Sequence, residues 1–93
     1  KNLAVVSGLC WRYDKGVQAT MGQVHNGVLG DITSMQCTYD TGLLWSKPRE
    51  EGWTDMEYQL RNWLYYTWLS GDHNNEQHIH SLDKMGWAMK DEY

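Results

Sequence analysis

A histidine and two carboxylates lie at helical spacing near the end of the chain. Glu76, His80 and Asp83 are separated by four and three residues, and Trp87 follows after another four. In a helix, these spacings bring all four side chains onto one face. A neutral imidazole can accept a proton from a hydroxyl group, and a carboxylate one turn away can orient the ring. The spacing permits acid/base catalysis by His80 and Glu76, although a solvated helical ion pair has the same spacing.

Four residues of the same segment are potential metal ligands: His73, Glu76, His78 and His80. Imidazole and carboxylate groups bind zinc and iron well. On one helix, however, the side chains of His78 and His80 diverge by about 200°, so they cannot reach the same ion. The segment also lacks the HExxH and CxxC patterns of zinc sites. The sequence therefore predicts no metal site.

Arg12 is a second candidate for ligand binding. It lies beside Tyr13 and Asp14, at the turn from a predicted strand to a predicted helix. Its guanidinium group carries a planar fork of donors that suits an anionic or hydroxyl-rich ligand. A surface ion pair between Arg12 and Asp14 would be built from the same neighbouring residues. The sequence leaves both interpretations open.

The elements expected to position these residues follow the order β-α-β-α-α. The apolar, Val- and Leu-rich run over residues 3–10 predicts a buried strand. Residues 32–39 alternate between two faces, one of them more polar, and predict a second strand. A helix is predicted between these strands, and two more helices follow a long loop over residues 40–52. The predicted fold class is α/β.

The helices carry their own start and stop signals. Apolar residues recur at spacings of four, three and four over residues 17–28, with Asp14 as the predicted cap and Gly27 or Gly30 as the predicted stop. The run from Thr54 to Glu57 is a capping box, which predicts a helix that continues to Ser70 and Gly71. Asp72 or Asn74 is expected to cap the last helix.

Composition narrows the classes of partner. The 93 residues carry a net charge of −4 and no basic run, which argues against a nucleic-acid surface or an anionic membrane. No apolar stretch approaches the ~20 residues that span a bilayer, so we expect no membrane insertion. The Trp- and Tyr-rich residues 62–68 suit a sugar-stacking platform, a core or a subunit interface. We expect Cys10 and Cys37 to be buried free thiols rather than one disulfide.

Several stretches resemble one family, the Gfo/Idh/MocA oxidoreductases. Residues 7–16 (SGLCWRYDKG) and 26–32 (NGVLGDI) resemble the junction between the two domains of that family. Residues 44–49 (LWSKPR) and 63–73 (WLYYTWLSGDH) are similar to an exported-type bacterial branch of it. Residues 76–83 (EQHIHSLD) fall on the family motif Asp-x-x-x-His-x-x-Asp. The resemblance covers essentially the whole chain.

The resemblance implies a dehydrogenase of sugars or polyols that uses NAD or NADP. His80 would be the general base that takes the proton of the substrate hydroxyl while the same carbon loses a hydride to the nicotinamide ring. Glu76 stands where the family usually has Asp and would help to position the substrate. Arg12 matches a family arginine near the bound polyol and cofactor. We also expect Tyr13 and Trp45 to contact the substrate.

The resemblance also implies a fold and a longer protein. Residues 1–30 would end a nucleotide-binding Rossmann domain and its linking helix. Residues 31–93 would open an α/β domain with an open-faced sheet, which binds substrate and forms homo-oligomer contacts. The family's glycine-rich dinucleotide fingerprint and the catalytic lysine of its Glu-Lys-Pro motif are not in this sequence. We therefore expect an internal piece, inactive alone, of an enzyme that is cytoplasmic or exported to the periplasm.

Two other functions stay open at this point. An NAD-dependent glycosidase of the same fold would cleave a glycoside with no net change in its cofactor. A non-catalytic module built on the Trp- and Tyr-rich residues 62–68 would bind a protein or a glycan without any need for His80. These residues determine neither the sugar nor the choice between NAD and NADP.

Overall fold

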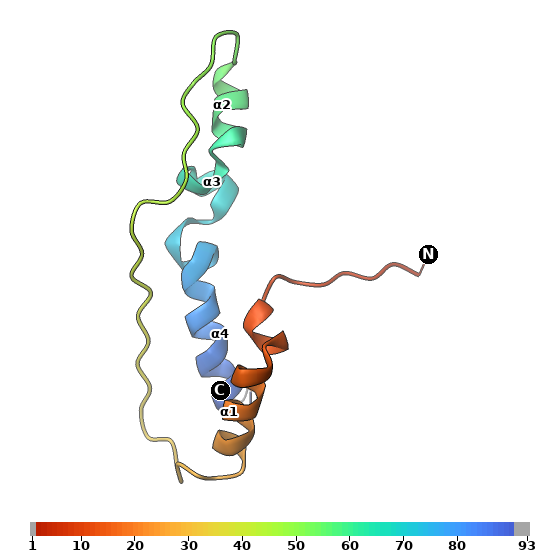
Figure 1. Ribbon diagram of the computed structural model, residues 1–93, viewed down its shortest axis with the longest axis vertical. Coiled ribbons are helices and arrows are strands. Elements are labelled where there is room, and N and C mark those ends of the chain that lie inside the picture. The colour runs from red at the N-terminus through yellow and green to blue at the C-terminus, as the bar shows by residue number, and fades with distance from the viewer. Residues whose placement is uncertain (1, 91–93) are drawn as a thin grey trace. The chain divides into compact units, whose positions relative to one another are not determined.

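The computed structural model describes residues 2–90, and their regular structure is entirely helical (Figure 1). Short helices of 3-10 type are η1 (Cys10–Tyr13) and η2 (Trp63–Tyr65), and η3 (Asn74–His78) is a π-type segment whose backbone is kinked at Glu76 and Gln77. The α-helices are α1 (Lys15–His25), α2 (Asp55–Arg61), α3 (Thr67–Ser70) and α4 (Ile79–Ala88). No helix within residues 2–90 is long and apolar enough to cross a membrane.

The chain divides into two compact units. Unit 1 contains residues 1–37 and 80–93, and so holds η1, α1 and nearly all of α4. Unit 2 contains residues 38–79, with α2, η2, α3 and η3. The residues expected to do chemistry are therefore distributed over both units, with His80 in unit 1 and Glu76 in unit 2.

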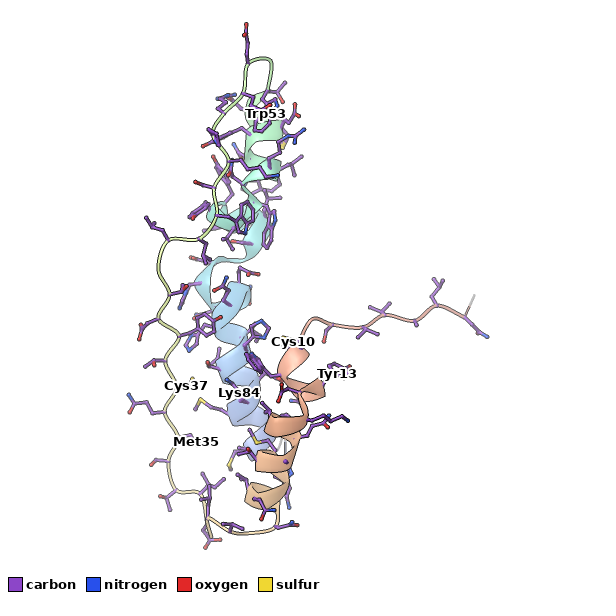
Figure 2. All side chains as sticks on the ribbon, in the orientation of Figure 1. Cys10, Tyr13, Met35, Cys37, Trp53 and Lys84 are labelled. Carbon is purple, nitrogen blue, oxygen red and sulfur yellow. The ribbon has the colours of Figure 1, made fainter. Side chains whose placement is uncertain are left out.

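The predicted α/β fold class is wrong, because residues 2–90 contain no strand. Residues 3–9 and 32–39 are extended without joining a sheet, and Figure 2 shows side chains projecting from these segments. Leu3, Val5 and Val6 are 80%, 94% and 75% exposed. A strand needs a neighbouring strand to bind its N–H and C=O groups. A strand-like pattern alone therefore builds neither the end of a Rossmann sheet nor an open-faced sheet.

Helix α1 begins and ends where the sequence predicts. The Oδ1 atom of Asp14 accepts a hydrogen bond from the backbone N–H of Val17 at 2.9 Å. This bond satisfies one of the donors that the first turn of a helix leaves unpaired. At the other end, Gly27 follows the cap with a φ of 83°, in the left-handed region that glycine adopts without strain. The predicted helix, its cap and its stop at Gly27 are confirmed.

Replacing Asp14 by Ala is expected to destabilise the first turn of α1 by about 1 kcal/mol, because the N–H of Val17 loses its acceptor. The measurement is amide hydrogen exchange at Val17, followed by NMR. Asp31→Ala is the matched control, since Asp31 is exposed and lies outside the helices. Equal exchange rates at Val17 in the two variants would show that the cap contributes nothing.

Helix α2 also begins at its predicted cap, but it is shorter than predicted. The Oγ1 atom of Thr54 accepts a hydrogen bond from the N–H of Glu57 at 3.2 Å. The helix ends at Arg61, and the backbone of Asn62 leaves helical geometry, with φ −117° and ψ 34°. Two separate short helices, η2 and α3, follow. Gly71, with φ 75°, ends α3 as predicted. The prediction of one continuous helix up to Gly71 is wrong.

Asn62 marks this break because its side chain binds the preceding loop. Its Oδ1 atom accepts a hydrogen bond from the N–H of Lys47 at 2.7 Å. Its Nδ2 atom donates to the carbonyl oxygens of Lys47, at 3.1 Å, and of Tyr58, at 3.2 Å. Asn62 is only 3% exposed. One buried amide thus satisfies both backbone groups of a loop residue and holds the loop against α2.

Neither unit has a fully buried hydrophobic core within residues 2–90. No hydrophobic side chain there is buried, and the two buried residues, Asn62 and Ser81, are polar. Both cysteines are free thiols, as predicted, but the prediction that they are buried is wrong: Cys10 is exposed and Cys37 is half-buried. Apolar burial, usually the main stabilising term, is therefore small. Polar and cation–aromatic contacts position the candidate site residues.

Candidate functional site

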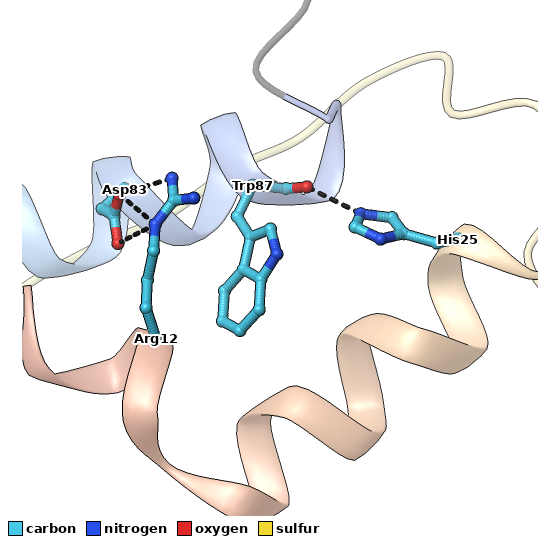
Figure 3. A network of polar contacts seen from close by, with 4 residues as sticks. All are labelled: Arg12, His25, Asp83 and Trp87. Carbon is cyan, nitrogen blue, oxygen red and sulfur yellow. Dashed lines mark hydrogen bonds and ion pairs between the residues drawn. The ribbon is translucent and has the colours of Figure 1, made fainter.

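In unit 1, Arg12 of η1 binds Asp83 of α4 through a two-pronged ion pair (Figure 3). The Nε atom of Arg12 lies 3.0 and 3.2 Å from the two carboxylate oxygens of Asp83, and Nη2 lies 2.8 Å from Oδ1. The Asp83 side chain is 7% exposed and that of Arg12 is 31% exposed. Arg12 thus pairs with a carboxylate 71 positions away, while its neighbour Asp14 caps α1.

Two cation–aromatic contacts join the same pair of helices. The Cζ atom of Arg12 lies 5.4 Å from the centre of the Trp87 ring, and Nζ of Lys84 lies 5.2 Å from the centre of the Trp11 ring. Both distances allow attraction between a cation and an aromatic face. Each helix thus contributes one cation and one aromatic ring: η1 provides Arg12 and Trp11, and α4 provides Lys84 and Trp87. We call these residues the η1–α4 clamp: Trp11, Arg12, Asp83, Lys84 and Trp87.

Helix α1 also forms hydrogen bonds with two residues of the clamp. The Nε2 atom of His25 lies 2.7 Å from the backbone oxygen of Trp87, a hydrogen bond that Figure 3 shows at the end of α4. The Nε2 amide of Gln18 donates to the backbone oxygen of Arg12 at 2.7 Å. His25 and Lys84 carry no sequence signal that would single them out. The adjacency of Trp11 to Arg12 and the shared helical face of Asp83 and Trp87 are the hints of the clamp in the sequence.

His80 lies on α4, one turn before Asp83 and Lys84. Its side chain is half-buried, and its Nδ1 atom is shielded from solvent without a hydrogen-bond partner among residues 2–90. A buried polar atom without a partner costs about 1–3 kcal/mol, and native proteins contain few of them. Nδ1 of His80 therefore lacks a hydrogen bond, and because atoms of the chain cover it, a hydroxyl group would supply that bond only after those atoms move aside.

Glu76 does not share a helical face with His80. Glu76 has φ −105° and ψ 102°, and Gln77 has φ 90° and ψ −45°, so both lie outside the helical region. Helix α4 begins only at Ile79, and no side chain caps η3 before it, so the predicted cap of the last helix at Asp72 or Asn74 is wrong. A spacing of four residues across this interruption no longer equals one helical turn. The predicted orientation of His80 by Glu76 through a shared turn is wrong, whereas the helical spacing of His80, Asp83 and Trp87 is confirmed.

Glu76 instead lines a cavity of about 310 Å³ within unit 2. Its wall combines apolar and polar side chains, among them Leu43, Leu44, Leu64, Asp72, His73 and Glu76. The hydroxyl group of Tyr65 donates a hydrogen bond to the backbone oxygen of Leu44 at 2.8 Å and joins two parts of this wall. A cavity of this size with mixed lining suits a small molecule that has an apolar face and hydroxyl groups.

The remaining predicted substrate contacts are largely exposed. Tyr13, at the end of η1 in unit 1, is 67% exposed. Trp45, in the loop of unit 2, is 47% exposed, and its ring centre lies 6.1 Å from that of Trp63 at an angle of 58°. Both rings are accessible to a ligand. Trp63, which the sequence placed among the residues of a platform or core, is the aromatic partner of Trp45.

The comparisons with known proteins add no assignment. Within residues 2–90, no group of three or more His, Cys, Asp or Glu side chains has a geometry that could hold a metal ion. No family model, curated protein or solved structure matches the chain. The geometry of unit 1, the geometry of unit 2 and the resemblance in residue pattern are therefore the grounds for a functional assignment.

Proposed function

We propose that the chain belongs to an oxidoreductase that uses NAD or NADP, in which His80 is the general base acting on a sugar or polyol hydroxyl. The observation that carries the proposal is the shielded Nδ1 atom of His80, which has no hydrogen-bond partner among residues 2–90. A general base must present a nitrogen that no protein group already occupies. Once the atoms that cover Nδ1 move aside, a substrate hydroxyl would form the missing bond and donate its proton there.

The described residues alone do not suit a dinucleotide. A pyrophosphate group is usually bound by a glycine-rich turn that opens a helix, where backbone N–H groups point at the anion. The run from Gly27 to Gly30 follows the end of α1 instead of preceding a helix. The proposal therefore assigns NAD or NADP to other parts of the enzyme. Within this chain, the role of His80 is to take and return the hydroxyl proton.

The cavity of unit 2 is, by itself, a second candidate site for a small hydroxyl-rich molecule, and there Glu76 would bind hydroxyl groups instead of orienting His80. Its carboxylate is half-buried and lines the cavity of unit 2 beside Asp72 and His73. Carboxylate oxygens accept hydrogen bonds from sugar or polyol hydroxyls. The apolar side chains Leu44 and Leu64 would contact the carbon face of the ring. The cavity volume of about 310 Å³ lies at the lower end of the range for small-molecule sites.

The experiment measures reduced nicotinamide formed from NAD or NADP with a panel of sugars and cyclic polyols. The protein tested is the longest natural protein that contains this sequence, with the 93-residue chain assayed beside it. We expect turnover by the longer protein and none by the chain alone. Cleavage of a glycoside without net reduction of the cofactor would select the glycosidase alternative. Absence of both activities and of cofactor binding would overturn the proposal.

One observation favours a second candidate, a non-catalytic binding module. Trp45, Trp63 and Trp68 of unit 2 are 47%, 40% and 59% exposed. Such rings provide contact area for a protein, for a glycan or for a homo-oligomer. A module of this kind would keep its binding affinity after His80→Ala and lose it after Trp68→Ala, as measured by calorimetric titration with the partner.

A further inference from the structure

We propose that Arg12 is a positioning residue that holds His80 in its working orientation, in place of the ligand-binding role that its sequence context suggests. It acts through the η1–α4 clamp, by setting how α4 is rotated about its own axis. The inference depends on the proposed function, in which His80 is the general base. The contacts that support it are nevertheless independent of any activity.

The clamp surrounds His80 on the surface of α4. Successive residues of an α-helix are rotated by about 100° about the helix axis. Relative to His80, Asp83 is therefore rotated by about −60°, Lys84 by about +40° and Trp87 by about −20°. The face of α4 that contacts η1 is thus centred close to the direction of His80. Any rotation of α4 that moves His80 must also move these contacts.

The contacts resist rotation in both senses. Asp83, on one side of His80, is held by two nitrogens of Arg12, with the shortest contact at 2.8 Å. Lys84, on the other side, reaches back to the Trp11 ring at 5.2 Å. Turning α4 one way lengthens the first contact, and turning it the other way lengthens the second. The planar fork of Arg12 also defines an angle, which a single-point contact does not.

Burial makes Arg12 necessary to Asp83. The Asp83 side chain is 7% exposed, and a nearly buried carboxylate requires a cationic or hydrogen-bonding partner. If Arg12 were lost, Asp83 would move toward solvent and α4 would rotate with it. Since Nε and Nη2 of Arg12 already donate to Asp83, they are committed to the clamp. Because these two nitrogens already bind Asp83, a positioning role for Arg12 fits the structure better than direct binding of a substrate or cofactor.

The test uses three variants and one matched control. Arg12→Lys keeps the charge but loses the fork, and Arg12→Gln loses both. The double variant Arg12→Asp with Asp83→Arg exchanges the two ends of the ion pair. The control is Arg61→Gln, because Arg61 also pairs with a carboxylate, that of Glu57 at 2.9 Å, and lies over an aromatic ring, that of Trp53 at 4.4 Å. Arg61 belongs to unit 2, whereas the residues of the clamp belong to unit 1.

The first readout needs no activity. NMR of the His80 ring in the 93-residue chain reports its orientation through its chemical shifts and line widths. We expect both Arg12 single variants to shift or broaden the His80 ring signals, Arg61→Gln to leave them unchanged and the double variant to restore them. Unchanged His80 signals in Arg12→Gln would overturn the inference, whether or not the protein proves to be an enzyme.

The second readout separates positioning from binding in the active protein. A base moved from its place lowers kcat, and we expect about a tenfold loss for Arg12→Gln with KM within about threefold. The double variant should recover most of that loss. A tenfold rise in KM with kcat retained, and no recovery in the double variant, would show that Arg12 binds the ligand directly. If His80→Ala leaves turnover unchanged, the proposed function fails, while the NMR result still decides the clamp.

Discussion

Replacing His80 by Ala is expected to lower turnover by at least about a hundredfold in the protein that contains this chain. A positioned general base contributes roughly 10²–10⁴-fold to the rate, and alanine removes the imidazole that would take the proton of the hydroxyl. The loss should fall on kcat, because the shielded Nδ1 atom of His80 would act on the reacting hydroxyl instead of on distant parts of the substrate. Steady-state rates of nicotinamide reduction measure it.

His78→Ala is the matched control for this prediction. His78 is half-buried, lies in unit 2 outside the lining of the cavity and contacts the ring of His73 at 5.4 Å between ring centres. Its loss removes the same ring from a neighbouring part of the sequence, and we expect turnover within about threefold of the unmodified protein. A His80→Ala variant that turns over as fast as this control would exclude both hydride transfer and NAD-dependent glycoside cleavage by the proposed route. The interaction module would then be the better assignment.

Replacing Asn62 by Ala is expected to detach the loop of unit 2 from α2. The variant loses three hydrogen bonds at 2.7, 3.1 and 3.2 Å, and the N–H and C=O groups of Lys47 both lose their partner. At a site that is 3% exposed, we expect a local cost of about 2 kcal/mol. That cost corresponds to roughly thirtyfold faster hydrogen exchange at the Lys47 amide, since each 1.4 kcal/mol is a factor of ten.

Two comparisons make this measurement specific. Asn62→Asp replaces the donor by a buried carboxylate oxygen that faces the carbonyl oxygens of Lys47 and Tyr58, so the Lys47 amide should exchange at least as fast as in the Ala variant. Asn74→Ala, at an exposed position of η3, should leave the Lys47 amide unchanged. If Lys47 exchanges at the same rate in all of these variants, the loop is held by something other than the Asn62 amide.

Features that depend on a few adjacent residues could be predicted from the sequence. The caps at Asp14 and Thr54 and the stops at Gly27 and Gly71 are all confirmed. Each is decided by a side chain and a backbone group within three residues of each other, or by a backbone angle that glycine permits. Local chemistry of this kind leaves little choice to the rest of the chain.

Strands and helix lengths were not decided locally. Residues 3–10 have strand-like composition, but within residues 2–90 no second segment pairs with them. The helix predicted from Thr54 to Ser70 is broken at Asn62, whose amide binds Lys47, fifteen positions earlier. In both cases the outcome depends on a partner distant in sequence, and local periodicity contains no information about that partner.

The candidate site also combines features that adjacent residues determine with features that depend on distant partners. The sequence by itself determined that His80, Asp83 and Trp87 share one face of a helix, because rotation per residue is a property of the backbone. The tertiary structure decided that Glu76 leaves that face and that Arg12 pairs with Asp83 instead of Asp14. The physical reason is that a nearly buried carboxylate must pair with a cation. Which cation lies close enough depends on how the helices pack, and here Arg12 lies 71 positions away in the sequence.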